Sequence, residues 1–314
     1  MSDIHTPVLL NEVLEFLDPQ PGKRFIDATL NGGGHTRALA EQGADVLGIE
    51  WDPVLAGQTA QAFADSELRE RVTVVNDSYV NLAAVAKEQN LIPDGILFDL
   101  GLSSWHYEHS GRGFSFKRDE PLDMRFDPRN GIPASEIVNT YEVAELEQAI
   151  RDYGDERFSR EIAHAIGKSR KEKPIMTAGE LAAVIDSAVP EWYKQQKSPS
   201  RQRPDGRATG NPIPRRKIHP ATKTFQALRV LVNEELSNVR AGVLAAIEIL
   251  PSGGRLAVIS FQGHEDKIVR ELFKEKVRAG IISQPTRRTT RPAWTEQREN
   301  PRSRSAKMKL AIKN

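Results

Sequence analysis

Short apolar runs alternate with amphipathic segments over the first hundred residues. Runs near residues 24–29, 45–50, 71–76 and 94–99 have the length and composition of buried strands. Between them, apolar residues recur at helical spacing near 34–42, 53–64 and 79–89, and residues 11–17 predict a short helix before the first strand. Strands that alternate with helices are typical of parallel βαβ units, so we expect an α/β fold.

The alternation stops after residue 104 and returns near residue 220. Residues 105–132 predict an ordered loop, followed by helices near 141–152, 155–170 and 177–188 with breaks at Pro174 and Pro190. A long helix at about 220–250, a strand at 255–261, a helix near 265–278 and a strand at 306–312 then complete the pattern. We therefore predict one domain from residues 1–104 and 218–314, with an insertion at 105–217 that comprises a loop, a helical substrate-recognition domain and a basic linker.

The first strand runs directly into Asn31, three glycines and His35. Glycine lets a backbone adopt positive φ and approach a ligand closely. The second apolar run ends in Glu50 and the fourth in Asp99. Acidic or glycine-rich ends on successive parallel strands place a ligand site at the carboxyl edge of the sheet.

The glycine spacing differs from the Gly-x-Gly-x-x-Gly pattern of dinucleotide sites, because no glycine stands where the helix packs on the strand. Asp27, in the end of the first strand, would repel a pyrophosphate but would suit the amino group of a methionine moiety. Glu50 would accept hydrogen bonds from ribose hydroxyls with either ligand. The pattern therefore favours S-adenosylmethionine over NAD, and a tight turn without a ligand is the alternative.

The composition narrows the possible chemistry. No apolar run approaches membrane-spanning length and the N-terminal residues do not resemble a signal peptide, so we expect a cytoplasmic protein without a membrane partner. The chain has no cysteine, which excludes disulfides and thiolate metal sites. It also excludes the cysteine nucleophile that methylation of a pyrimidine ring carbon usually needs, so a base methyltransferase of this composition would target nitrogen or oxygen.

Charge is unevenly distributed along the chain, whose net charge is only +1. Residues 191–217 contain eight basic and two acidic residues, and residues 287–309 repeat these numbers. Each stretch therefore carries +6, and the remainder of the chain about −11. Two basic stretches on an acidic body indicate a polyanionic partner, and a solubilising loop and tail are the alternative.

Several segments together resemble the RsmH (MraW) small-subunit rRNA cytidine N4-methyltransferases, in the family's order and over nearly the whole chain. The matching segments are HTPVLLNE at 5–12, GGH at 33–35, DLGLSS at 99–104, RGFSF at 112–116, PLDMR at 121–125, YGDERF at 153–158, HPATKTFQALR at 219–229, ISF at 259–261 with Glu265 and Asp266, and NPRSRS at 300–305. The resemblance implies a class I S-adenosylmethionine-dependent methyltransferase fold (Rossmann-like) with an inserted helical domain. It also implies S-adenosyl-L-methionine as donor and, as substrate, a cytidine in the decoding centre of 16S rRNA in the small ribosomal subunit, methylated on its exocyclic N4 amine.

The resemblance also assigns cofactor contacts, to which the strand-end argument adds Asp27. The family's contacts fall on Gly33, Gly34, His35, Glu50, Tyr79, Asp99 and His106. The chain departs from the family at several of its positions: Glu50 replaces Asp, His106 replaces Gln, Asn31 replaces Gly, and residues 262–264 (Gln-Gly-His) replace His-Ser-Leu. If the family's His serves the substrate, His264 must do so from a shifted position.

Candidates for the chemistry lie after the fourth strand. Cytosine's exocyclic nitrogen is a poor nucleophile, so positioning and hydrogen bonds from its N–H groups must supply most of the acceleration. We expect the acceptor to be Asp99 or the backbone of Ser103 and Ser104, and a contact of Asp99 with the cofactor alone is the alternative. His106, Glu108 and His109 lie close in sequence but lack regular spacing and a fourth ligand, so no metal site is predicted.

Further residues are candidates for contacts with RNA. Trp105, Phe114 and Phe116 could stack on the target base, and ordinary packing of the loop is their alternative role. His219 either caps the following helix or faces the cleft. Arg302 and Arg304 either contact RNA phosphate or support the sheet edge.

Other functional classes stay open on these residues. One is a methyltransferase that acts on another RNA, which the departures at Glu50, His106 and residues 262–264 would accompany. Another is a non-catalytic ribosome assembly factor that retains the fold. An NAD oxidoreductase is the weakest, because the glycine spacing and the basic stretches both argue against it.

Overall fold

The computed structural model describes residues 7–194, 219–286 and 288–314. The chain forms two compact units, one from Met1–His106 and Glu234–Asn314, the other from Tyr107–Asn233. The sequence placed the domain boundaries after residues 104 and 217. Helix α11 (Ala221–Val232), which we expected in the first unit, instead belongs to the second.

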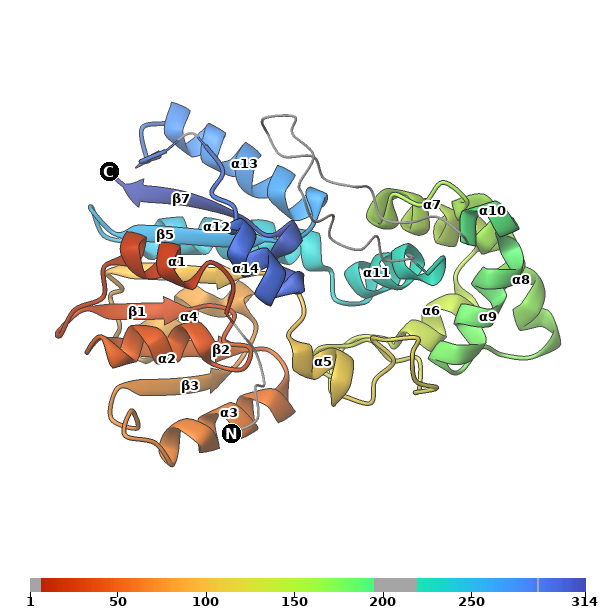
Figure 1. Cartoon of the computed structure of the whole chain (residues 1–314), viewed down its shortest axis with the longest axis horizontal. Coiled ribbons are helices and arrows are strands. Elements are labelled where there is room, and N and C mark those ends of the chain that lie inside the picture. The colour runs from red at the N-terminus through yellow and green to blue at the C-terminus, as the bar shows by residue number, and fades with distance from the viewer. Residues whose placement is uncertain (1–6, 195–218, 287) are drawn as a thin grey trace. The chain divides into compact units, whose positions relative to one another are not determined.

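The first unit contains a seven-stranded sheet, shown in Figure 1. Its strands are β1 (Arg24–Asp27), β2 (Asp45–Glu50), β3 (Val72–Asn76), β4 (Gly95–Asp99), β5 (Arg255–Ser260), β6 (Ile282–Ser283) and β7 (Lys307–Lys313). Their order is β3-β2-β1-β4-β5-β7-β6. β1 to β5 pair in parallel, and β7 pairs antiparallel with both β5 and β6.

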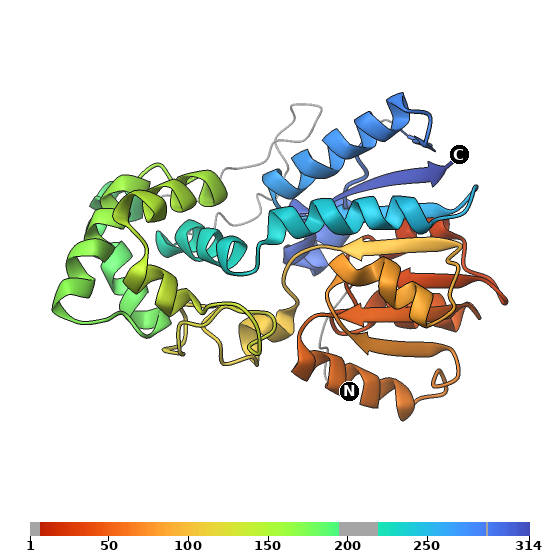
Figure 2. The same ribbon diagram turned by 180° about the vertical axis from the view of Figure 1, so that it is seen from behind.

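Helices cover both faces of this sheet. α1 (Leu10–Leu17), α2 (Gly34–Glu41) and α3 (Pro53–Ala64) bury apolar residues against one face, and α4 (Leu82–Glu88), α12 (Glu235–Ile249) and α13 (Gly263–Arg278) against the other. Figures 1 and 2 show the two layers from opposite sides. Successive strand residues alternate between the layers, as Phe25 and Ile26 do, so the strands are apolar on both faces as parallel strands require.

β1 lies between β2 and β4, so the chain order reverses on either side of it. In open α/β sheets, ligands bind beyond the carboxyl ends of the strands at such a switch point. The segments at this position are residues 28–33 after β1 and residues 100–103 after β4. The fold therefore places the candidate site at the glycine-rich turn and the segment after Asp99.

The second unit is helical. Its longer helices are α6 (Ala134–Thr140), α7 (Val143–Gly154), α8 (Ser159–Glu172), α9 (Ala178–Ala188) and α11, with a short α10 (Glu191–Lys194). α7 and α11 approach closely at Gly154, where a Cβ atom would lie 2.6 Å from the carbonyl oxygen of Lys223. Glycine is needed there because any side chain would push the two helices apart.

The predicted helix at 220–250 is wrong in one respect, because two helices occupy this segment. α11 ends at Val232, and Glu234 has a left-handed φ of 48° before α12 begins. The amide of buried Asn233 causes the break: it accepts from the Phe126 N–H and donates to the carbonyls of Met124 and Arg229. The predicted helix at 79–89 likewise divides into η1 (Tyr79–Asn81) and α4.

Some short elements escaped the sequence analysis. They are α5 (Ser104–Glu108), α6, α10, β6, α14 (Trp294–Glu299) and η2 (Pro301–Ser305). None of these except α6 exceeds six residues, and so brief a segment carries little periodic signal.

Candidate functional site

The turn after β1 joins the ends of three strands. Asn31, with a left-handed φ of 52°, donates its backbone N–H to Glu50 Oε2 at 2.8 Å. Its side-chain Nδ2 donates to the carbonyl oxygens of Thr29 at 3.0 Å and Asp99 at 3.3 Å. Asn31 thus connects the segment after β1 with the last residues of β2 and β4, a role for its side chain that glycine could not fill.

Glycine is required at positions 33 and 34 of this turn for different steric reasons. Gly33 precedes α2 with a φ of 77°, and a Cβ there would lie 2.7 Å from the Phe63 ring. A Cβ on Gly34 would lie 3.0 Å from the Pro7 ring, tighter than an ordinary contact. Packing against the protein therefore accounts for glycine at these two positions, in addition to any close approach to a ligand.

Glu50 is held rigidly at the end of β2. It is 6% exposed, and its two carboxylate oxygens accept the N–H groups of Asn31 and Asp52 at 2.8 and 2.9 Å. Two such charge-assisted bonds fix the carboxylate orientation. Because each carboxylate oxygen can accept more than one hydrogen bond, this arrangement is compatible with ribose hydroxyl donors.

Asp27 is buried at the end of β1, with 1% of its surface exposed. The Thr36 hydroxyl donates to Oδ2 at 2.7 Å, and the Thr29 N–H donates to Oδ1 at 3.3 Å. Burial raises the pKa of this carboxyl above its usual range and the nearby Asp99 adds to the rise, while His35 and the two hydrogen bonds oppose it. A carboxylate held in this state favours a cationic neighbour.

His35 lies beside Asp99, and both side chains are buried. The His35 Nε2 is 3.0 Å from the carbonyl oxygen of Val8, which can only accept, so Nε2 carries a proton. Nδ1 faces Asp99 Oδ2 at 3.6 Å. The start of α2 and the end of β4 therefore lie next to each other at this imidazole.

A second buried polar chain joins Ser103, His106 and Asp52, none more than 3% exposed. Ser103 Oγ lies 2.9 Å from His106 Nδ1, and His106 Nε2 lies 3.3 Å from Asp52 Oδ2. With a proton on Nε2, facing the carboxylate, Nδ1 accepts the serine O–H. Asp52 Oδ1 also caps α3 by accepting the N–H groups of Val54 and Leu55, so the segment after β4 is tied to the start of α3.

The donor set at this edge fits a cationic ligand with hydroxyl groups. Asp27, Glu50 and Asp99 bring three buried carboxylates to adjacent strand ends. A ligand with an ammonium and a sulfonium group would offset their charge, whereas the pyrophosphate of a dinucleotide would add to it. The residues present therefore fit S-adenosylmethionine.

The other predicted residues of the first unit lie in two places. Tyr79 packs edge-to-face on Phe98, with ring centres 5.7 Å apart, and Trp105 is 6% exposed against His106. Ser260, the last residue of β5, pairs with Lys307, the first residue of β7. The segment after β5, which contains His264, and the segment before β7, which contains Arg302 and Arg304, therefore meet the sheet at the carboxyl end of β5. His264 is in the first turn of α13, and the two arginines are in η2.

The altered segment 262–264 has a clear local role. Gln262 forms a capping box with Glu265: its side chain accepts the N–H of Glu265, while the Glu265 carboxylate accepts the N–H of Gln262. Glu265 also accepts from the N–H of Phe261. The departure from the family pattern therefore leaves a well-formed start of α13.

Three predicted residues lie in the second unit and pack within it. Phe114 is 5% exposed and stacks on Phe126 at 5.7 Å, and Phe116 stacks on His219 at 4.5 Å. His219 Nδ1 accepts the N–H of Ala221, the first residue of α11, at 3.1 Å. Packing accounts for the burial of Phe114, and its role and that of Phe116 toward RNA stay predictions.

Asp52, Thr29 and Thr36 belong to the site but escaped the sequence analysis. Asp52 precedes Pro53 at a helix start, a signal that predicts a cap and could have indicated its buried position. The Thr29 hydroxyl accepts the Asp99 N–H at 2.5 Å. No sequence signal shows the contacts of the two threonines, because they depend on how the strands pair.

The structure describes most of the second basic stretch but little of the first. Residues 195–217 of the first lie outside the described residues. In the second, Lys307 and Lys309 pair with Asp266 at 3.2 and 2.8 Å, so part of this charge is used within the protein. Within the described part of the chain, no cluster of three potential metal ligands occurs and no helix is long and apolar enough to cross a membrane.

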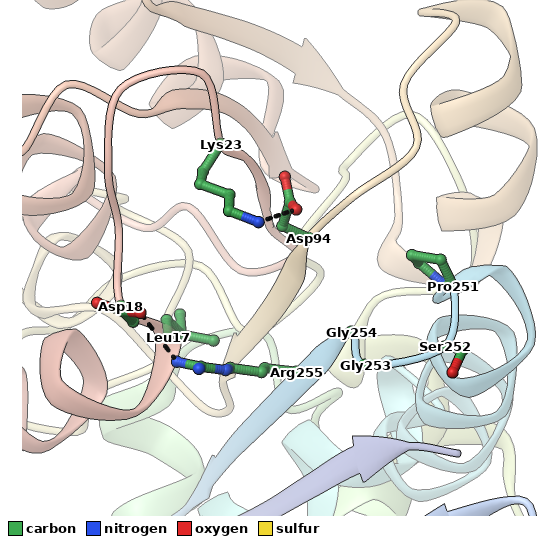
Figure 3. Close-up of a pocket in the computed structure, with 9 residues that line it drawn as sticks. All are labelled: Leu17, Asp18, Lys23, Asp94, Pro251, Ser252, Gly253, Gly254 and Arg255. Atoms are coloured by element: carbon green, nitrogen blue, oxygen red, sulfur yellow. Dashed lines mark hydrogen bonds and ion pairs between the residues drawn. The ribbon is translucent and has the colours of Figure 1, made fainter.

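A separate cavity of about 260 Å³ lies at the opposite edge of the sheet. Figure 3 shows its lining, in which Lys23 pairs with Asp94 at 2.7 Å and Arg255 with Asp18 at 3.7 Å. Gly95 pairs with Arg255 at the first residues of β4 and β5, so this is the amino edge. Its lining charges are paired, and it lies away from the strand ends where ligands bind in such sheets.

Comparison with known proteins agrees with this geometry. The chain is 41% identical to Ribosomal RNA small subunit methyltransferase H of Deinococcus deserti, over 98% of this chain and 93% of the relative. Relatives of the same name from Dehalococcoides mccartyi and Thermomicrobium roseum are each 40% identical, over 98% and 99% of this chain and 86% and 94% of theirs. The profile of the MraW methylase family matches residues 2–314. The chain therefore belongs to the MraW methylase family and has the class I methyltransferase fold with an inserted helical unit.

Proposed function

We propose that this protein transfers the methyl group of S-adenosyl-L-methionine to the exocyclic N4 amine of a cytidine in the decoding centre of 16S rRNA. The observation that carries the proposal is the convergence of Asp27, Glu50 and Asp99 at the carboxyl edge of the sheet, in a chain of the MraW family. The names of its relatives support an rRNA of the small subunit as substrate.

The chain's residues hold the cofactor in defined roles. Asp27 accepts hydrogen bonds from the ammonium group, and Glu50 accepts from the ribose hydroxyls. Gly33, Gly34 and His35 lie where the turn meets the start of α2 and contact the methionine part, and Tyr79 and His106 border the site. When bound, S-adenosylmethionine supplies a methyl group made electrophilic by its positively charged sulfur.

Asp99 orients the target amine. Its carboxylate accepts a hydrogen bond from the amine N–H, and the His35 imidazole lies 3.6 Å from it. The Ser103 hydroxyl is engaged with His106, so the backbone of Ser103 and Ser104 contributes the second acceptor. As the N–C bond formed, the methyl–sulfur bond would break with its electron pair left on sulfur, and the amine would pass one proton to Asp99.

The substrate contacts fall to the remaining predicted residues. Trp105 in the first unit, and Phe114 and Phe116 in the second, are aromatic platforms for unstacked bases of the RNA, and the inserted unit contributes to RNA recognition. In the first unit, Arg302 and Arg304 bind phosphate and His264 contacts the RNA, and in the second unit His219 contacts the RNA.

The test uses labelled S-adenosylmethionine and small ribosomal subunits from a strain without the modification. Nuclease digestion and mass spectrometry then locate the label. Label on the exocyclic nitrogen of one decoding-centre cytidine supports the proposal, and the Asp99→Asn variant should then lose turnover while it still binds the cofactor. Label on a different nucleotide would show that the substitutions at Glu50, His106 and residues 262–264 accompany another specificity. Absence of both label and cofactor binding would favour an assembly factor.

A further inference from the structure

An exposed aromatic and cationic cluster lies on the helical unit. Trp192 in α10 is 51% exposed, and the Arg157 guanidinium lies 5.0 Å from the centre of its ring. The same guanidinium lies 5.1 Å from the Phe158 ring. We call Arg157, Phe158, Trp192 and Tyr193 the Arg157–Trp192 cluster.

A buried carboxylate holds the cluster together. Glu156 is 2% exposed, and its oxygens accept the Phe158 N–H at 2.9 Å and the Tyr193 hydroxyl at 2.6 Å. Burial raises the pKa of Tyr193, and the bond to Glu156 raises it further, so the hydroxyl keeps its proton and remains a donor. Glu156 therefore holds together the two chain segments of the cluster, which are 35 positions apart in sequence. Trp192 is adjacent to the anchored Tyr193, so its position is also restricted.

The exposed part of the cluster has no evident structural use. Arg157 is exposed and forms no ion pair with a carboxylate of the described residues, whereas nearby Lys194 is paired with both Asp186 and Glu191. An exposed tryptophan beside an arginine without a carboxylate partner offers a π-face for stacking and several N–H donors for an anion. A nucleotide combines both features, since it has a base that stacks and a phosphate that accepts.

We propose that the Arg157–Trp192 cluster is a subsite for a single-stranded segment of the RNA substrate. One base stacks on Trp192, and Arg157 donates to the adjoining phosphate. The proposal rests on the proposed function, because it assigns a contact to that same substrate. Charge favours RNA over an apolar protein partner, since residues 193–217 carry eight basic residues and one acidic residue directly after the tryptophan.

The test measures binding of a fluorescein-labelled single-stranded RNA 12-mer to the full-length protein at fixed salt. Trp192→Ala should weaken binding about 5- to 150-fold, the range that one base–aromatic stack supplies. Trp192→Phe should retain most of the affinity, whereas Trp192→Leu, which keeps an apolar surface without a π-face, should not. Arg157→Ala should also weaken binding and flatten its salt dependence. Met176→Ala is the matched control, because Met176 is 53% exposed on the same unit and has no aromatic ring on which a base could stack.

Fluorescence gives a readout that a merely structural role would not change. Stacking of a base on Trp192 should quench part of the tryptophan emission in the wild type. This part of the quenching should be absent in Trp192→Phe, in which Trp51, Trp105 and Trp294 still emit, although that variant still binds. Wild-type affinity in both Trp192→Leu and Arg157→Ala would overturn the proposal. So would a loss confined to assembled subunits and absent with the 12-mer, which would indicate a ribosomal protein as the contact. Methylation by the wild type is assayed separately, so failure of the proposed function and failure of this subsite give different results.

Discussion

Replacing Asp27 by Asn should separate the stability of the ligand-free protein from its affinity for the cofactor. Asp27 is 1% exposed, and burial raises the pKa of its carboxyl. Asn has the same shape without the charge. The Thr36 hydroxyl can rotate to accept from the new amide, and the Thr29 N–H can still donate to the remaining oxygen.

The effect on stability depends on pH in a defined direction. A carboxyl whose folded pKa is raised contributes stability below its unfolded pKa, and this contribution is lost as pH rises through the folded value. The free energy of unfolding of the wild type should therefore fall relative to that of Asp27→Asn as pH rises above the unfolded pKa of about 4. Each unit by which the folded pKa is raised corresponds to about 1.4 kcal/mol of that difference.

Asp27→Asn should gain stability relative to the wild type as pH rises, but it should bind the cofactor more weakly. A hydrogen bond to a charged group contributes about 1.5–3 kcal/mol, so Asp27→Asn should bind S-adenosylmethionine about 10- to 100-fold more weakly. Calorimetric titration measures the affinity, and urea unfolding at pH 4.5 and 8 measures the stability.

A second carboxyl serves as the control for Asp27. Asp266 is also buried, which tends to raise the pKa of its carboxyl, but hydrogen bonds with Lys309 and Lys307 lower this pKa overall. Its contribution is present above its unfolded pKa and is lost as pH falls, so Asp266→Asn should destabilise the protein most at pH 8. Equal destabilisation by Asp27→Asn at both pH values, or wild-type cofactor affinity, would refute the reasoning about Asp27.

Two further predictions concern packing and the buried polar chain. His106→Leu removes the ring that faces the fully buried Asp52, so it should lower the free energy of unfolding by about 1–3 kcal/mol. His106→Gln keeps a hydrogen-bond donor, so its loss should be less than half as large. Urea unfolding measures both losses. Equal losses would show that the donor is unimportant. Gly113→Ala should cost about 2–4 kcal/mol, since Gly113 has a φ of 69° and a Cβ would lie 2.5 Å from the carbonyl oxygen of Pro121. Gly111→Ala, at a φ of 66° with no atom within 4 Å, should show only the conformational part in thermal unfolding, so equal costs at the two positions would exclude the steric explanation.

The sheet could be predicted from sequence because each strand carries its own signal. The apolar runs near 45–50 and 94–99 match β2 and β4 almost residue for residue, since parallel strands are buried on both faces. The break at Glu234 could not be predicted in this way. The local sequence favours a continuous helix there, and the helix ends because Asn233 bonds to a segment more than 100 residues away.

The residues of the candidate site also differ in whether the sequence could predict them. Asp27, Glu50 and Asp99 could be assigned because they stand at strand ends, whose positions follow from the strands themselves. The chain from Ser103 through His106 to Asp52 could not be assigned, because it depends on the five-residue helix α5 and on a partner about 50 positions earlier. Trp192 and Arg157 meet for a similar reason, through helix packing that has no sequence period.

Charge pairing distinguishes the two edges of the sheet and explains why the ligand site is at one of them. At the amino edge, burial tends to raise the pKa of Asp94, but hydrogen bonds from Lys23 and from the Arg24 N–H lower it overall. Its charge is already compensated within the protein, and a ligand would gain little by approaching it. At the carboxyl edge, burial and the neighbouring Asp99 raise the pKa of Asp27. Without a cation nearby, the negative charge of Asp27 is unfavourable in its buried position. A cationic ligand therefore stabilises this charge and is bound by it.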